Sequence, residues 1–320
     1  MDYPRDVARA FCPSRGDPKR PTISPVACFA LCLRRACRQA YGSFYSFFLG
    51  VVVFYFAVGQ FIASLVGDGL NVLGGYSPDV CMQQYPELQA ACLNLQESTY
   101  VPAISAVVFI VVAMGASTSA STFGCEKAQY WREAAAGLHT PAYFFAKVAA
   151  DVPLCVVSAV SIWAALISGF DSPMPNGQLL LNFLGINIFG YCSGYFLSFL
   201  LPYTACGLAA VAWSVFWSQM FSGAGGKSMS EEPDLKWIFA MSAPRWFLEA
   251  VFYATTVDPF DEVPSGPNEG EPYFDLSRQK QAYRYFNTYW DCIGWLFFVN
   301  LCLLVIDLLL ITGTKLEKKR

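Results

Sequence analysis

Blocks of apolar residues, each about 20 residues long, divide the sequence into membrane-length segments. A helix of this length crosses a hydrocarbon core of about 30 Å. A proline at position 202 breaks the longest apolar run into two helices. The predicted spans lie near 43–66, 101–123, 143–168, 178–200, 203–224 and 290–312. The pattern therefore predicts an all-α membrane protein with six transmembrane helices.

The residues before the first span form a polar tail and an amphipathic helix. Residues 1–24 are polar with scattered Pro and Gly, and we expect a flexible cytoplasmic tail. Ser24 followed by Pro25 is typical of a helix start. Over 25–41, apolar side chains recur at helical spacing while arginines gather on another side, which predicts a helix lying along a membrane surface on the cytoplasmic side.

Two longer segments between the spans are predicted to lie outside the membrane. Residues 67–100 form a polar loop in which Cys81 and Cys92 could form a disulfide, with two free thiols as the alternative. Residues 225–289 form a loop long enough to have its own structure. Its apolar middle, LKWIFAMSAPRWFLEAVFYATTV, is broken by Pro244 and predicts a re-entrant or interfacial helix pair, with a seventh full span as the alternative.

Basic residues predict the orientation of the chain. Most of the 21 Lys and Arg residues lie before the first span, between or beside spans two and three, and after span six. The positive-inside rule then places both termini in the cytoplasm. The expected location is a membrane crossed several times, and we favour the plasma membrane.

Composition excludes several functions. Hydrophobic residues make up 55% and charged residues 14% of the chain, and the net charge is −3, which argues against a nucleic-acid partner. With His139 as the sole histidine, we expect no catalytic site, bound cofactor or metal. The GAGGKS run from Gly223 to Ser228 has Phe221 where a phosphate-binding loop needs glycine, so we reject nucleotide binding there.

The link between spans two and three carries the most specific pattern. It reads FGCEKAQYWREAAAGLHTPAYFFAKVAADVPL, a polar helix after the span, a turn near Gly137, and Lys147 and Asp151 on one face of the next helix. The pattern F..EK..(Y/F).RE...G......YF.AK...D.P resembles the ABC-2 type transmembrane domain of the G subfamily of ABC transporters, the White and breast-cancer-resistance type. FSG at Phe221 and SAPRWFLEA at Ser242 also match. The resemblance covers roughly 22–320, so residues 25–320 are expected to form this domain.

This resemblance implies a half-transporter membrane domain that works as a dimer with an ATPase domain. The ATPase domain, with its ATP and Mg²⁺, normally lies on the N-terminal side, and this sequence contains neither a Walker A motif nor LSGGQ. We therefore expect a truncated product, an isolated domain, or a permease served by a separate ATPase. The implied partners are a second half-transporter subunit in a homodimer or heterodimer, an ABC ATPase domain, membrane lipid and a hydrophobic or amphipathic substrate.

The resemblance also assigns candidate site residues by position. Coupling to the ATPase would involve Glu126, Arg132 and Glu133, with an ordinary solvated charge pair as the alternative. The substrate cavity would include Met114, Ser117, Phe216 and Gln219, although such residues often only pack between helices. The family often has bulky aliphatic residues after FSG as a plug, and Ala224 and Gly225 depart from that pattern.

Two features within the spans have competing interpretations. Gly190 and Gly194 form a GxxxG pattern, for which we favour packing inside the chain over dimerisation. Asp307 lies in span six, where an ionisable residue suggests function, but snorkelling or a polar partner from a neighbouring helix is the safer interpretation.

The function predicted from the sequence is therefore transport. We expect the permease part of a G-type transporter that moves lipids, sterols or other hydrophobic compounds. The alternative is a truncated, non-transporting partner that dimerises with full-length half-transporters and regulates them.

Overall fold

The computed structural model describes most of the chain as a bundle of helices. The described residues are 24–42, 49–61, 63–64, 86–169, 174–223, 234, 236–254 and 288–317, and no strand occurs among them. The helices are α2 (Pro25–Tyr41), α5 (Pro86–Gly124), α6 (Lys127–Ala135), α7 (Thr140–Gly169), α8 (Asn176–Leu200), α9 (Tyr203–Val215), the π-helix η1 (Phe216–Met220), α10 (Lys236–Ala240), α11 (Ala243–Phe252) and α14 (Tyr289–Glu317).

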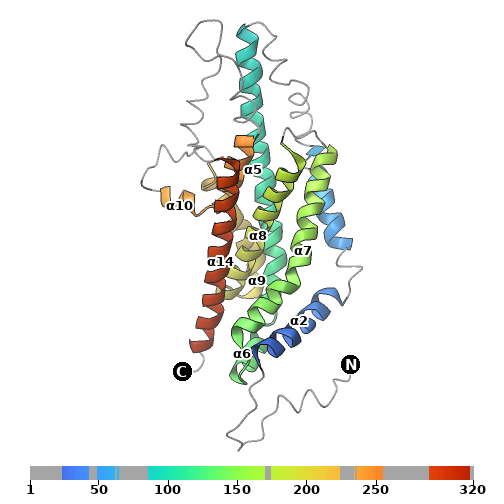
Figure 1. The fold of residues 1–320 in the computed structure, drawn as a ribbon, viewed down its shortest axis with the longest axis vertical. Coiled ribbons are helices and arrows are strands. Elements are labelled where there is room, and N and C mark those ends of the chain that lie inside the picture. Colours follow the sequence, from blue (N-terminus) through green and yellow to red (C-terminus); the bar gives the residue numbers. More distant parts are fainter. Residues whose placement is uncertain are drawn as a thin grey trace, which may run out of the picture.

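Within the described residues, four helices are long and apolar enough to cross a membrane. These segments are Ile104–Gly124, Thr140–Gly169, Asn176–Leu200 and Tyr289–Gly313, and they belong to α5, α7, α8 and α14. Figure 1 shows these helices side by side along the long axis, with α2 and α6 together at the end where α14 finishes. This end is called the inner end below, and the opposite end the outer end.

The other two predicted spans are shorter in the described residues. An apolar helix covers Leu49–Phe61, within the predicted 43–66. The predicted span 203–224 contains α9 and then the π-helix, which ends at Met220. The count of six spans therefore stays a prediction. The helix over Pro25–Tyr41 has the predicted bounds, and the hydroxyl of Ser24 accepts a hydrogen bond from the backbone amide of Ala27 at 3.3 Å.

The predicted loop over 67–100 is wrong in its second half. Helix α5 already begins at Pro86 and runs for 39 residues, so Cys92 lies in a helix. The stretch PELQAACLNLQESTY is rich in good helix formers such as Glu, Leu, Gln and Ala, and its proline opens the helix, where proline is tolerated. Cys81 and the side chain of Cys92 lie outside the described residues, as does GAGGKS beyond Gly223.

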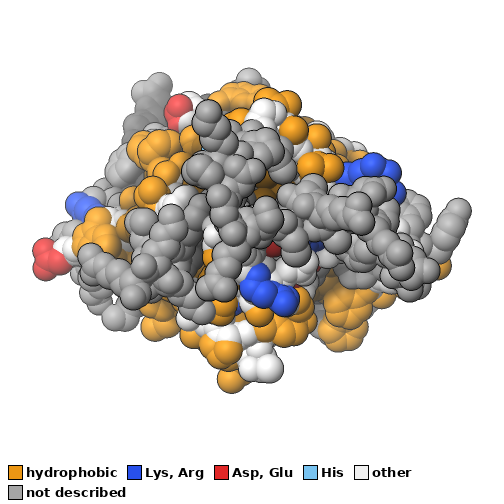
Figure 2. Space-filling view, turned by 90° about the horizontal axis from the view of Figure 1, so that it is seen from below, with side chains coloured by type: hydrophobic (Ala, Val, Ile, Leu, Met, Phe, Trp, Pro, Cys, Tyr) orange, Lys and Arg blue, Asp and Glu red, His pale blue; other side chains and the backbone are white. Residues whose placement is uncertain are grey.

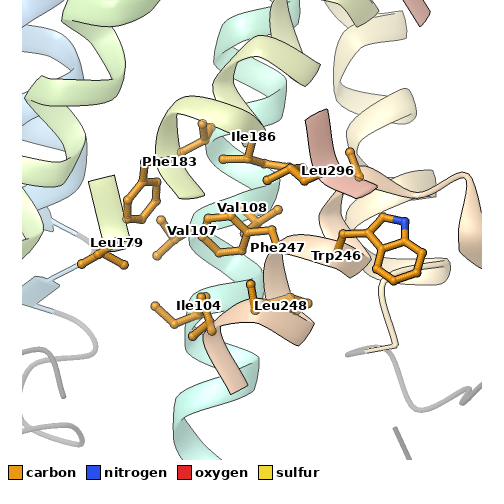
Figure 3. Packing of buried hydrophobic residues seen from close by; sticks show 14 of the residues in the cluster. Ile104, Val107, Val108, Leu179, Phe183, Ile186, Trp246, Phe247, Leu248 and Leu296 are labelled. Atoms are coloured by element: carbon orange, nitrogen blue, oxygen red, sulfur yellow. The ribbon is translucent and has the colours of Figure 1, made fainter. Parts of the chain in front are cut away.

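The segment around Pro244 forms two short helices, as predicted for a broken apolar stretch. Ser242 caps α11 by accepting a hydrogen bond from the amide of Arg245 at 3.4 Å, and Pro244 occupies its first turn. Helix α11 enters the hydrophobic core toward the outer end. Figure 3 shows Phe247 pointing between side chains of α5 and α8. Its ring lies 5.4 Å from that of Phe183, which makes α11 a buried part of the bundle.

The closest helix packing joins α5 and α8. Gly190 lies against Gly115 and Val112 of α5, and Gly194 lies against Ala116 and Ser119. Small residues at both surfaces allow the two backbones to approach closely. The GxxxG pattern therefore serves packing within the chain, as predicted.

Candidate functional site

Helix α6 is a nine-residue segment that stands at the inner end of the bundle. Glu126 precedes it at the N-cap position. Gly137, whose φ of 105° is a left-handed value that favours glycine, turns the chain back just after it. His139, the sole histidine, then caps α7, because its Nδ1 accepts a hydrogen bond from the amide of Ala142 at 3.3 Å. Local sequence thus ends α6 before Gly137 and starts α7 after His139.

Two carboxylates of this region hold one guanidinium of α2. Nη1 of Arg35 lies 2.6 Å from Oε1 of Glu133, and Nη2 lies 3.3 Å from Oε2 of Glu126. Burial disfavours the charge on Arg35, but Glu133 and Glu126 outweigh this effect, so the pKa of the guanidinium is raised above its ordinary value. The clamp ties α2 to the link between α5 and α7.

A second cation shares the carboxylate of Glu126. Nζ of Lys147 on α7 lies 2.9 Å from Oε2 of Glu126, and the hydroxyl of Tyr143 donates to the same oxygen at 3.4 Å. Lys147 also donates to Oε1 of Gln39 on α2 at 3.2 Å. Because Lys147 is buried, losing Glu126 would leave a buried ammonium without its carboxylate partner. Glu126 therefore joins α2, α7 and the start of α6.

Helix α6 also reaches α8 and α14. Nζ of Lys127 donates to the carbonyl of Leu201 at 2.7 Å and to that of Phe199 at 3.4 Å, where the carbonyls at the end of α8 need donors. The hydroxyl of Tyr130 donates to the carbonyl of Ile311 on α14 at 3.2 Å, and its ring stacks on Tyr143 at 5.1 Å. Burial lowers the pKa of Lys127 and raises that of Tyr130.

These contacts leave one side of α6 free. Ala128, Arg132 and Ala135 are exposed, as is His139 beyond the helix. Arg132 makes no ion pair within the part of the chain that the structure describes, so it does not pair with neighbouring elements as Glu133 does. The free side of α6 therefore carries small residues and one guanidinium.

A polar column continues from this site into the bundle. The carboxylate of Asp151, one turn beyond Lys147 on α7, accepts hydrogen bonds from Thr122 at 2.7 Å and Tyr195 at 2.8 Å. One turn further along α7, the carbonyl of Cys155 accepts a hydrogen bond from the side-chain amide of Asn187 on α8 at 2.7 Å. Buried polar groups thus connect the inner end with the middle of the bundle.

The predicted cavity residues lie on α5 and η1 and differ in exposure. Ser117 and Phe216 are exposed, whereas Met114 is half-buried. Gln219 is also half-buried, and its amide donates to the carbonyl and the hydroxyl of Ser105 on α5 at 3.3 and 3.2 Å. A pocket among the described residues lies elsewhere, at the inner end. It is lined by Phe123, Lys127, Tyr130, Trp131, Tyr143, Phe199 and Ile311.

Asp307 does not snorkel, contrary to the prediction. Its side chain is fully buried, and neither carboxylate oxygen has a hydrogen-bond partner among the described residues. The carboxyl lies near Cys192 on α8. Seven residues earlier on each helix, the side-chain amide of Asn300 on α14 donates to the carbonyl of Gly185 on α8, so the two helices keep the same register. The packing of α14 on α8 therefore holds this residue inside the bundle.

Four residues that complete the site were not predicted from the sequence. These are Arg35, Lys127, Tyr130 and Tyr143. One signal was present, since Glu126 and Glu133 are seven positions apart and so share one side of a helix, which predicts a common basic partner. Within the described ranges, no group of His, Cys, Asp or Glu side chains is arranged to hold a metal ion.

Comparison with known proteins gives a family for this chain. A family model described as "ABC-2 type transporter" matches residues 85–259, which is more than half of the sequence. The matched region runs from the start of α5 through α11 and includes the whole of α6. No curated protein sequence matches the chain.

Proposed function

The chain belongs to the ABC-2 type transporter family, a family of membrane domains that pair with an ATPase component, and from this premise we propose that it is the permease of a G-type transporter. Its cargo would be lipids, sterols or other hydrophobic compounds. The ATPase domain that drives the movement, with its ATP and Mg²⁺, lies outside this sequence, and the chain itself performs no catalysis.

The observation that carries this proposal is the set of contacts made by α6. Side chains of this helix and its N-cap hold α2 through Arg35, α7 through Lys147, α8 through the carbonyl of Leu201 and α14 through the carbonyl of Ile311. A force applied to α6 therefore reaches four helices at once. A short, rigidly held helix with one free side suits the transfer of movement from an ATPase.

We assign the ATPase contact to the free side of α6. Ala128 and Ala135 offer no bulk, so a partner could approach closely, and Arg132 offers a charge that a carboxylate of the partner could pair with. This assignment keeps Arg132 and Glu133 in the coupling site but separates their roles. Glu133 holds the helix to α2, whereas Arg132 faces the partner.

The second subunit would pack along α9 and η1. Leu208, Val211 and Val215 lie at i, i+3 and i+7 on α9 and are 81%, 43% and 40% exposed. Exposed Phe216 and Ser117 continue this side onto η1 and α5. Two copies facing each other would enclose an apolar space with a few polar groups, which is what a hydrophobic cargo needs.

Transport would follow from a population shift between two arrangements of the bundle. ATP binding to the ATPase would favour one arrangement through α6, since a partner shifts an equilibrium only by binding one state better. In this proposal six helices span the plasma membrane and both termini are cytoplasmic, so that α2 and α6 face the ATPase.

The test is reconstitution of the full chain with an ABC ATPase domain in lipid vesicles. We expect ATP-dependent movement of a fluorescent phospholipid across the bilayer. Arg132→Glu should abolish this movement without lowering the melting temperature, because the side chain is exposed. The control is Lys236→Gln on α10 at the outer end, which removes a cation far from α6 and should leave movement unchanged.

A chain that binds a full-length half-transporter and stops its transport would instead be a regulatory partner. The exposed stripe on α9 would allow such pairing. The same vesicles containing an active half-transporter distinguish the two functions, because a permease restores or supports movement and a regulatory partner reduces it.

A further inference from the structure

Helix α2 carries two arginines on its exposed side that have no acidic partner in the described chain. Arg34 and Arg38 are both exposed and lie at i and i+4, on the same side of the helix. Arg35 between them is different, because Glu133 and Glu126 already neutralise it. The nearby carboxylates of Glu126 and Glu133 thus already pair with Arg35 and Lys147.

The position of α2 along α7 gives the depth of these two side chains. Helix α7 has 30 residues and so is about 45 Å long, the thickness of a bilayer with its head groups, about 40–45 Å. Gln39 of α2 meets Lys147, which lies seven residues or about 10 Å from the start of α7. Tyr41 donates to the carbonyl of Ala150, about 15 Å from that start.

Arg34 directly precedes Arg35 and Arg38 directly precedes Gln39, and the contacts of Arg35 and Gln39 give their depth along α7. Arg35 meets Glu126, which also accepts a bond from Tyr143, about 5 Å above the start of α7. The two free arginines therefore lie about 5 to 10 Å from that end, where head groups give way to hydrocarbon. Figure 2, which views the molecule from this end, shows Lys and Arg side chains at its surface beside hydrophobic ones.

We propose that Arg34 and Arg38 bind the head-group phosphate of an anionic phospholipid beside the inner end of α7. Guanidinium groups match phosphate oxygens in a paired geometry. Two of them spaced about 6 Å apart on one helix side suit a single head group. The lipid neutralises the two charges that the described chain leaves unpaired and holds α2 against the bilayer. This site requires only that α7 spans a membrane and is independent of the ATPase.

An attraction between Arg38 and the end of the helix dipole is a simpler role for that residue alone. Arg38 lies in the last turn of α2, where a cation is favourable. Arg34 lies outside that turn, so the dipole does not account for it. The pair, and not Arg38 alone, is therefore what defines the lipid site.

The test is native mass spectrometry of the purified full chain with an equimolar mixture of phosphatidylserine and phosphatidylcholine. The chain should retain phosphatidylserine preferentially. Arg34→Gln and Arg38→Gln should each reduce this preference about 5-fold, the effect of one basic residue near an anionic surface. The double variant Arg34→Lys with Arg38→Lys should keep most of the preference for phosphatidylserine, because both positive charges remain.

Arg132→Gln is the matched control, since it removes an exposed arginine from α6 and should not change lipid retention. Melting temperatures check that each variant is folded. An unchanged preference in the double Gln variant would overturn the proposal. Millimolar inorganic phosphate that raises the melting temperature as much as phosphatidylserine does would also overturn the proposal, because the site would then bind a free anion and not a lipid.

Discussion

Arg35 on α2 and Glu133 on α6 are 98 positions apart in the sequence, yet their guanidinium and carboxylate approach to 2.6 Å. We expect Arg35→Gln and Glu133→Gln each to lower the free energy of unfolding, with a coupling energy of about 1 kcal/mol, since both side chains are only partly exposed. A double-mutant cycle measured by thermal unfolding in detergent gives this value.

Two comparisons check this coupling. Glu126→Gln should destabilise the protein more than Glu133→Gln, because Glu126 serves Arg35, Lys147 and Tyr143 together. Arg34→Gln is the matched control on α2 and should leave the unfolding temperature in lipid-free detergent unchanged, because Arg34 makes no ion pair with the described residues. Strictly additive effects of the Arg35 and Glu133 variants would show that the ion pair contributes nothing.

The buried pair on α11 should behave differently from the pair on α2. Glu249 is fully buried and accepts a bond from Arg245 at 3.2 Å, and the guanidinium of Arg245 lies 4.7 Å from the ring centre of Trp246. Glu249→Gln removes the carboxylate from a buried cation, so we expect a loss of about 3–5 kcal/mol in the free energy of unfolding. This loss should exceed that of Glu133→Gln in the same assay.

The double variant Arg245→Met with Glu249→Leu provides the control for that result. It removes both charges and keeps apolar volume, so it should recover much of the lost stability. If Glu249→Gln were as mild as Glu133→Gln, burial would not govern the strength of this pair.

Periodicity and length predict most of the fold because the bilayer imposes them. Apolar blocks of about 20 residues indicated the helices that became α5, α7, α8 and α14. Proline 244 indicated the break before α11, and Ser24 the start of α2. The extension of α5 back to Pro86 was missed because a polar helix outside the membrane has no apolar block to mark it.

The candidate site was only half predictable for a related reason. Glu126 and Glu133 came from a local motif, whereas Arg35 was one of three similar arginines on α2. Which arginine meets the carboxylates depends on how α2 rotates against α7, and that is set by contacts over long sequence distances. The burial of Asp307 was missed because the packing partner, α8, lies more than 100 residues earlier.

The hydroxyl of Tyr130 should matter more for transport than for stability. Tyr130→Phe removes the hydroxyl that donates to the carbonyl of Ile311 and that also lies 3.3 Å from the hydroxyl of Thr140, at a cost of about 1 kcal/mol. Tyr289→Phe removes a similar bond, to the carbonyl of Gln178 at the outer end, and should cost the same. If α6 transmits movement to α14, only Tyr130→Phe should slow ATP-driven lipid movement in vesicles.

Equal loss of transport in the two tyrosine variants would argue against that role for Tyr130. Equal melting temperatures are the necessary check, because they show that both proteins lose a comparable interaction. The comparison thus separates transmission through α6 from general loosening of the bundle.

The contact between α5 and α8 predicts a graded series of glycine substitutions. A methyl group on Gly194 would overlap the backbone carbonyl of Ala116, which cannot move aside, so Gly194→Ala should be strongly destabilising. On Gly190 the nearest atoms are backbone atoms of Gly115 and Val112 at 3.2 Å, a tight contact without overlap, so Gly190→Ala should cost less. Gly207 on α9 has open space, and Gly207→Ala should be neutral or stabilising by about 0.5–1 kcal/mol, because alanine favours the helix. Thermal unfolding of the three variants in one detergent measures the order. A Gly194→Ala protein as stable as Gly207→Ala would mean that α5 and α8 do not pack this closely.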